Sequence, residues 1–238
     1  MCRIKFLGIL FLGFIIGIDF SVDGKDLSRT FHSGGNQQDT LIDNQNLFNG
    51  RIWRNLYSQF EGNQFLFSGE FLSGSLTING KRFTDVLLKY DICNDEILTP
   101  VDPGGILQLN KERVDSFSLL FQDRIIKFIK MQFDSVKGSK NYYNVLYKGK
   151  TALYVKFTKK INKLTVGGEN EKFYQFSRIY FIKNNVVFLI NNKGDMIKAL
   201  IDRKELIKSF IKKIRLSVSE KEPESFIPVI KYYENISR

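Results

Sequence analysis

Three acidic residues at the end of an apolar run, Asp91, Asp95 and Glu96, could hold a metal ion or act as an acid and a base. A calcium loop needs a denser series of oxygen ligands and a glycine, and this stretch lacks both. Asn94 and Asp95 also suit a turn, because their side chains bond readily to nearby backbone groups. We therefore favour a turn here, with a metal or acid–base site as the alternative.

The chain lacks the residues that most catalytic and metal sites require. Its one histidine, His32, and its two cysteines, Cys2 and Cys93, argue against histidine-dependent nucleophilic catalysis and against zinc sites. No phosphate-binding glycine motif is present, of either the Walker or the dinucleotide type. We predict that the protein is not an enzyme, with no cofactor and with no catalytic, cofactor-binding or metal-binding residues. The alternative is a carboxylate-based hydrolase acting on glycans, although no two carboxylates stand out by their spacing.

Positive charge is concentrated in the second half of the chain. Residues 122–216 contain 22 basic and 7 acidic side chains, a net charge of +15, whereas residues 25–121 are slightly acidic. Such a surplus suits a polyanionic neighbour, either anionic lipid head groups or acidic glycans. Lysines that simply face solvent and block edge pairing of strands remain the simpler explanation. The candidate residues for contact with an anionic surface are Lys204, Lys208, Lys212 and Lys213.

Aromatic residues crowd the stretch from 47 to 67. They are Phe48, Trp53, Tyr57, Phe60, Phe65 and Phe67. A sugar-binding platform is one interpretation. Packing in a sheet is the favoured one, because aromatic side chains suit pleated, half-buried surfaces.

The N-terminus has the pattern of a secretory signal peptide. Arg3 and Lys5 precede an apolar run that is shorter than the roughly 20 residues of a membrane-spanning helix. We predict cleavage near Gly24, which leaves no transmembrane span in the mature protein. The protein would then be exported through the inner membrane and be periplasmic or extracellular, with peripheral attachment to the outer membrane as one option.

Export shapes two further expectations. Cys93 would be the one cysteine of the mature chain, so no intramolecular disulfide can form. Basic and aromatic residues interleave in residues 142–160, as on proteins that bind single-stranded nucleic acid, but an exported protein is a poor candidate for nucleic-acid binding.

The predicted organisation is a signal peptide at 1–24, a flexible linker at 25–46 and one β-rich domain with C-terminal helices at 47–238.

A hairpin is predicted around Asn79 and Gly80, which lie between two apolar runs. A two-residue turn of this kind needs a positive φ at both positions, and Asn and Gly tolerate it best. After the turn, apolar and polar residues alternate, which predicts a strand with one buried face. The apolar set is Val86, Leu88, Tyr90 and Ile92.

The segments SLTINGKRFTDVLLKYDICNDEI and ILQLNKERVDSFSL, with the upstream FEGNQFLFSGEF and the late KSFIKKIRL, carry a resemblance. They resemble a recurrent group of uncharacterised exported β-rich proteins of Bacteroidetes. These pieces together touch most of the mature chain. The resemblance implies export and a β-rich fold, and it implies no activity and no catalytic residues.

Short alternating segments continue to about residue 190 and are separated by turn residues such as Asn184-Asn185. About eleven short strands in hairpin series predict an antiparallel meander. The expected fold class is α+β, mainly β: an open barrel or a sandwich, with two C-terminal helices packed on it.

The first of these helices is predicted to be capped by Asp202, with Glu205 three positions on. Helical spacing places apolar residues on one face, namely Leu206, Ile207, Phe210, Ile211 and Ile214. We predict that Phe210 is a buried core residue. A second helix is predicted to start at the cap Ser225, so that Pro228 falls in its first turn.

The sequence predicts an exported cell-envelope protein of unknown function with an interaction or structural role. A polyanionic surface is one candidate neighbour, beside the simpler explanation that the lysines only face solvent.

Overall fold

The predicted central hairpin is present in the computed structural model, which describes residues 49–133, 140–161 and 172–237. Strands β2 (Leu72–Ile78) and β3 (Lys81–Asp91) form this hairpin. Asn79 and Gly80 have φ angles of 49° and 80°, in the left-handed region that these two residue types adopt most easily. The turn therefore follows from local backbone chemistry.

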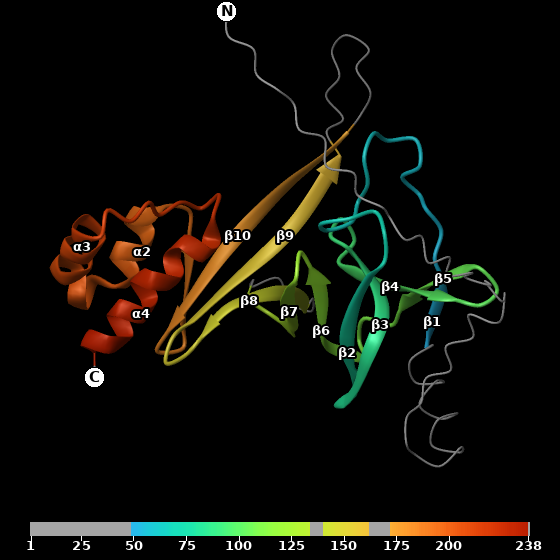
Figure 1. Cartoon of the computed structure of the whole chain (residues 1–238), viewed down its shortest axis with the longest axis horizontal. Helices are drawn as coiled ribbons and strands as arrows, with labels where there is room; N and C mark the ends of the chain where they lie inside the picture. Colours follow the sequence, from blue (N-terminus) through green and yellow to red (C-terminus); the bar gives the residue numbers. More distant parts are fainter. Residues whose placement is uncertain (1–48, 134–139, 162–171, 238) are drawn as a thin grey trace, which may run out of the picture. The chain divides into compact units, whose positions relative to one another are not determined.

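In the part of the chain that the structure describes, eleven strands form one open antiparallel sheet (Figure 1). The remaining strands are β1 (Gly50–Ile52), β4 (Glu96–Val101), β5 (Gly105–Leu109), β6 (Val114–Phe121), β7 (Arg124–Met131), β8 (Asn141–Lys148), β9 (Ala152–Ile161), β10 (Phe173–Lys183) and β11 (Val186–Ile190). Their order is β1-β5-β4-β3-β2-β6-β7-β8-β9-β10-β11, so β1 and β11 are the edges. The predicted α+β, mainly β, antiparallel fold is confirmed.

Two more hairpins use paired residues with positive φ. Gln122 and Asp123, with φ of 49° and 58°, join β6 to β7. Asn184 and Asn185, with φ of 50° and 63°, join β10 to β11. Asparagine and aspartate are the non-glycine residues that tolerate this region best, which explains Asp123, Asn184 and Asn185 but not Gln122. The sequence predicted the turn at Asn184-Asn185 for this reason.

Apolar side chains cover both faces of the sheet. On one face, a first cluster is built on β2 to β8 and includes Leu76, Leu88, Tyr90, Phe117, Phe128 and Tyr142. It is continuous with a second cluster under the helices, because Phe157 packs against both. Tyr143, Tyr154 and Tyr180 form a third cluster. It lies on the opposite face, since neighbouring residues of a strand alternate between faces.

Three helices complete the described chain and pack on the second cluster: α2 (Lys193–Ala199), α3 (Lys204–Lys213) and α4 (Ile227–Ile236). Short 3-10 helices, η1 (Ile201–Arg203) and η2 (Pro223–Phe226), precede α3 and α4. Figure 1 shows the three helices together beside the end of β10.

The prediction of two C-terminal helices was one short, because it missed α2. This helix has seven residues, too few for a clear apolar period, and it contains Gly194. Its one local signal is the cap Asn192, whose side-chain oxygen accepts a hydrogen bond from the backbone N–H of Asp195 at 3.1 Å.

Both predicted helix caps were wrong. Asp202 lies within η1, and α3 begins at Lys204 after Arg203, whose side chain makes no cap bond. Ser225 lies within η2, and its hydroxyl bonds to the backbone of Ser219. Pro228 does fall in the first turn of α4, as expected.

The predicted signal peptide, 1–24, and the predicted linker, 25–46, lie outside the described residues. Within the described ranges, no helix is long and apolar enough to cross a membrane.

Candidate functional site

Helix α3 carries the four predicted contact residues, Lys204, Lys208, Lys212 and Lys213, and all four are exposed. Lys208 Nζ lies 3.2 Å from Glu205 Oε1. Among the described residues, the side chains of the other three lysines make no ion pair or hydrogen bond. From Arg203 to Arg215 the chain has six basic residues and one acidic residue, so this helix presents a strong excess of positive charge to solvent.

Two buried side chains, Ile207 and Ile211, fix α3 to the second apolar cluster. The predicted apolar face was too wide. Leu206 and Ile214 are 49% and 47% exposed. Phe210 is half-buried and stacks on Tyr232, with ring centroids 4.1 Å apart and planes at 4°. Phe210 is therefore not the fully buried core residue that the helical spacing predicted.

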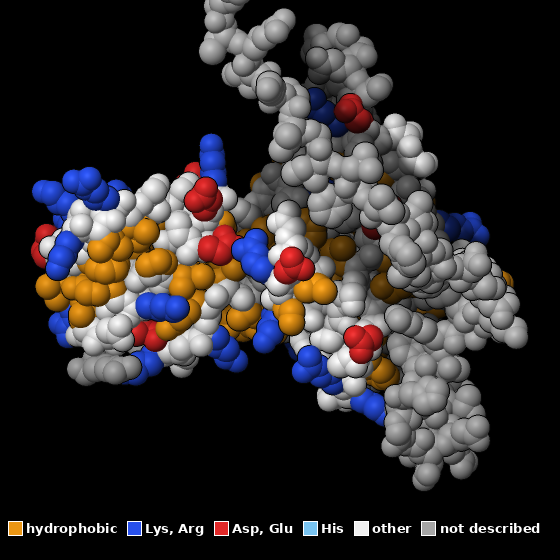
Figure 2. Space-filling view, in the orientation of Figure 1, with side chains coloured by type: hydrophobic (Ala, Val, Ile, Leu, Met, Phe, Trp, Pro, Cys, Tyr) orange, Lys and Arg blue, Asp and Glu red, His pale blue; other side chains and the backbone are white. Residues whose placement is uncertain are grey.

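Figure 2 shows hydrophobic side chains gathered over the region of the helices, with lysine and arginine side chains around them. At 3.6 residues per turn, the line Leu206–Phe210–Ile214 and the line Lys204–Lys208–Lys212 lie on opposite flanks of the buried pair. Lys204, Lys208 and Lys212 are thus separate from the apolar line, whereas Lys213, seven positions after Leu206, lies on the apolar flank.

Polar contacts hold the helical region onto the sheet. Asp202 accepts hydrogen bonds from Lys183 Nζ at 2.5 Å and from the Tyr233 hydroxyl at 2.9 Å. Burial acts to raise the pKa of Asp202, but the bonds from Lys183 and Tyr233 outweigh it and lower the pKa below its usual value.

Glu234 of α4 makes a second link to the sheet. Its carboxylate accepts bonds from the Tyr147 hydroxyl at 2.8 Å, from the Thr151 backbone N–H at 2.6 Å and from the Thr151 hydroxyl at 2.8 Å. Burial acts to raise the pKa of Glu234, and the bonds from Thr151 and Tyr147 outweigh it, so the pKa is lowered. Glu234 thereby ties α4 to the β8–β9 hairpin.

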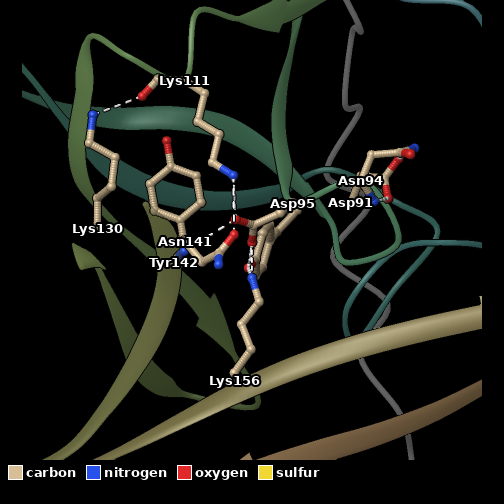
Figure 3. Close-up of polar contacts among 9 residues, drawn as sticks. Asp91, Asn94, Asp95, Lys111, Lys130, Asn141, Tyr142 and Lys156 are labelled. Carbon is tan, nitrogen blue, oxygen red and sulfur yellow. Dashed lines mark hydrogen bonds and ion pairs between the residues drawn. The ribbon is translucent and has the colours of Figure 1, made fainter. Parts of the chain in front are cut away.

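The acidic residues at the β3–β4 turn form a different kind of site. Asp95 is 8% exposed and has a φ of 60°. Its carboxylate accepts hydrogen bonds from Lys156 Nζ, from Lys111 Nζ at 2.6 Å and from the Tyr90 hydroxyl at 2.5 Å. Figure 3 shows Asp95 between the two lysines, which approach from opposite sides.

The two lysines control the ionisation of Asp95. Burial acts to raise the pKa of this carboxyl, but the ammonium groups of Lys156 and Lys111 outweigh burial and hold the pKa below its usual range. Burial, with Asp95 beside it, raises the pKa of Tyr90 well above its usual value. The group is therefore a charged carboxylate with a neutral phenol, shared between two ammonium groups.

The turn predicted at Asn94-Asp95 is present, but Asp91 and not Asp95 bonds to its backbone through the side chain. Asp91 Oδ1 accepts from the backbone N–H groups of Cys93 at 2.9 Å and of Asn94 at 3.0 Å. Its Oδ2 accepts from the Asn94 side chain at 2.9 Å. Burial raises the pKa of Asp91, although these bonds act to lower it. Every carboxylate oxygen thus has a partner from the turn itself.

Other lysines of the sheet also bond inward. Lys130 Nζ donates to the carbonyls of Lys111 at 2.9 Å and Glu112 at 2.7 Å. Lys159 Nζ donates to the carbonyls of Asn63 at 3.0 Å and Phe65 at 2.5 Å. Burial lowers the pKa of both ammonium groups. These residues contribute to the excess of positive charge in the sequence, yet their ammonium groups form hydrogen bonds to backbone carbonyls within the fold.

Cys93 is half-buried, and burial raises the pKa of its thiol to about 11. The thiol Sγ lies 3.2 Å from the carbonyl oxygen of Lys159. A thiol with a raised pKa is a poor nucleophile at neutral pH.

A cavity of about 310 Å³ lies beside this turn. Its lining comes from β1, the loop after β1, the β3–β4 turn, β4 and β5: Arg51, Ile52, Trp53, Arg54, Leu56, Tyr57, Gln64, Asn94, Glu96 and Gln108. Glu96 lines it, whereas Asp91 and Asp95 do not. Burial and the nearby Asp91 raise the pKa of Glu96, while Arg51 acts to lower it.

The three acidic residues singled out in the sequence therefore have three separate surroundings. Asp91 closes the turn through hydrogen bonds, the charged Asp95 is ion-paired with two lysines, and Glu96 faces a cavity. Among the described residues, no group of three or more His, Cys, Asp or Glu side chains could hold a metal ion. Sequence reasoning missed Lys111 and Lys156, because they are 16 and 61 positions from Asp95 and no local pattern connects them.

No protein-family model, curated protein or solved structure matches this chain. The site is therefore interpreted from its own geometry.

Proposed function

We propose that this is an exported, non-catalytic protein of the cell envelope, and that it binds a polyanionic surface through α3. The observation that carries the proposal is the exposed set Lys204, Lys208, Lys212 and Lys213 on a helix that two buried isoleucines and the α4 contacts hold in place. The anion can come from lipid head groups or from acidic glycans, because both present closely spaced negative charge. The resemblance to exported Bacteroidetes proteins and the N-terminal pattern support the cellular setting.

A rigid helix suits this role better than a mobile lysine-rich segment. The charges of Lys204, Lys208 and Lys212 are already fixed along one flank, and that of Lys213 on the opposite flank, so binding costs little ordering of the backbone. Each lysine near an anionic membrane surface contributes about 1 kcal/mol, and the attraction falls off within a Debye length of about 8–10 Å. Four lysines therefore supply useful affinity at low salt.

The test is co-sedimentation of the mature protein with vesicles that contain an anionic phospholipid and, separately, retention on an acidic polysaccharide. Replacing the four α3 lysines by glutamine should weaken binding at least tenfold on whichever anion is bound, and raised salt should weaken binding of the native protein. The matched control replaces four exposed lysines of the sheet region by glutamine: Lys127, Lys148, Lys160 and Lys172. No retention on either anion at low salt, or equal losses in both variants, would contradict the proposal.

Export is tested independently of binding. N-terminal sequencing of protein recovered from cells should give a mature chain that starts near Gly24. An intact Met1 on that material would contradict export.

One observation favours the alternative, a carboxylate-based hydrolase that acts on glycans. Glu96 faces a cavity and has a raised pKa, as a general acid requires. Glycoside hydrolysis needs a second carboxylate across the bond, and no other carboxylate belongs to the described lining of this cavity. Release of reducing ends from acidic glycans that disappears in Glu96→Gln would establish the hydrolase over the binding protein.

A further inference from the structure

The cavity beside β1 has a lining that suits a sugar. The side chains of Trp53 and Tyr57, both half-buried, supply aromatic surface. Gln64, Asn94 and Gln108 supply amide groups, and Gln64 is 2% exposed. Small-molecule sites combine apolar and aromatic walls with a few fixed polar groups in this way, and about 310 Å³ is at the lower end of their usual range of 300–1,000 Å³.

The cavity is built before any ligand arrives. The Trp53 backbone N–H donates to the carbonyl of Ile106 at 2.8 Å, and the Tyr57 hydroxyl donates to Asn94 Oδ1 at 3.2 Å. Tyr57 also packs against Phe60 and Phe173, with ring centroids 6.1 Å and 5.7 Å away. These contacts fix the loop after β1, so little conformational entropy is lost on binding.

Among the described residues, the charged groups of the lining include one cation, Arg54, that has no ion pair. Arg51 Nε donates to Gln108 Oε1 at 2.7 Å, and an Arg51 guanidinium nitrogen lies 3.6 Å from Glu96 Oε1. Arg51 and Glu96 therefore offset each other. Arg54 is exposed and makes no hydrogen bond or ion pair within the described part of the chain. Its guanidinium is free to bind a carboxylate with two parallel hydrogen bonds.

We propose that this cavity binds an acidic monosaccharide unit, a uronic acid, as a free sugar or within a glycan. Arg54 binds the carboxylate, Gln64 and Glu96 bond to ring hydroxyls, and the apolar face of the ring packs on Trp53 and Tyr57. This site is separate from α3 and does not depend on the function proposed for the lysines.

Trp53 makes the test direct, because it is the single tryptophan of the chain. The mature protein is titrated with glucuronic acid and galacturonic acid while tryptophan emission is recorded. Emission should change saturably with at least one uronic acid. The corresponding neutral sugars, glucose and galactose, should bind at least tenfold more weakly, and acetate should give no change, because it lacks the ring. No saturable change with either uronic acid, or an equal response to the neutral sugar or to acetate, would overturn the proposal.

Variants separate the site from general charge effects. Arg54→Gln should weaken uronic acid binding at least tenfold, and Arg54→Lys should restore part of it. Arg124→Gln, which removes an exposed arginine of β7, is the charge-matched control and should bind as the native protein does. Equal losses in Arg54→Gln and Arg124→Gln would overturn the assignment of Arg54. The variant without the four α3 lysines should keep the full response, so failure here and failure of the α3 proposal are distinguishable.

Discussion

The sheet and the helical end of this protein use lysine in opposite ways. In the sheet, Lys156 and Lys111 point inward to the buried carboxylate of Asp95. On α3, Lys204 and Lys212 point into solvent, where water already satisfies their charge. The same residue type is a structural element in one region and a surface charge in the other.

The difference shows what a net charge can and cannot indicate. The +15 of residues 122–216 includes Lys130, Lys156 and Lys159, whose ammonium groups are bonded inside the fold. Those charges contribute little to attraction at a distance. The exposed part of the excess, which includes α3, is the part on which the proposed anion binding depends. Substitutions that remove the buried ion pairs of the sheet should therefore lower the free energy of unfolding far more than substitutions of the exposed charges on α3.

The largest effect is expected from Asp95→Asn. The change removes the buried carboxylate charge that lies between Lys156 and Lys111, and breaking a buried ion pair typically costs about 3–5 kcal/mol. Urea denaturation measures the free energy of unfolding. The matched control is Glu205→Gln on α3, whose exposed pair with Lys208 should contribute less than about 0.5 kcal/mol. Similar losses in the two variants would remove the distinction between the regions.

Within α3, Ile207→Ala should come next. Ile207 is fully buried under the helix, and truncation of a buried isoleucine costs about 2–5 kcal/mol. Leu206→Ala, one position away and half-exposed, should cost less than about 1 kcal/mol. Thermal and urea unfolding of both variants would show whether the helix has the narrow buried stripe that the structure places there.

Acid should weaken the sheet through Asp95. The folded pKa of this carboxyl lies below its unfolded value of about 3.9, so its stabilising contribution is complete above that value. The contribution is lost as the pH falls through the folded pKa. The free energy of unfolding should therefore fall more steeply with acidification in the native protein than in Asp95→Asn. Asp202 and Glu234, whose pKa values are also lowered, act in the same direction and are present in both proteins. Parallel pH profiles would contradict the assigned role of Asp95.

The smallest effect is expected from replacing all four α3 lysines by glutamine. Their side chains are exposed, and removing like charges from one helix relieves repulsion. The free energy of unfolding should change by less than about 1 kcal/mol, even though the proposed anion binding should weaken at least tenfold. A large loss of stability would mean that these lysines also contribute to the fold.

The sequence predicted the strands and their turns well, because both depend on neighbouring residues. Asn79-Gly80 and Asn184-Asn185 adopt the positive φ that their chemistry favours. Alternation along β3 identified its buried face, and Val86, Leu88 and Tyr90 are all buried. These signals are local, so they are visible without knowledge of the pairing.

The contacts that position the sites were not predictable in the same way. Asp202 resembles a helix cap in sequence but bonds to Lys183 and Tyr233, which β10 and α4 bring to it. Phe210 fits the apolar period of α3, yet its neighbour on α4, Tyr232, determines how far it is covered. Of the predicted site residues, the four lysines are exposed together on α3. The cavity that contains Trp53 and Arg54 draws on segments far apart in the chain.

The strand order also bears on how quickly the chain folds. From β6 to β11, each strand pairs with the one that follows it, so each hairpin can form soon after its residues meet. Two pairs are different. In β1–β5 Gly50 meets Leu109, and in β2–β6 Gly74 meets Leu119, so three strands lie between the two members of each pair. Closing these long segments costs chain entropy before any contact compensates for it. We expect the docking of β5 on β1 and of β6 on β2, rather than the formation of the hairpins, to set the folding rate.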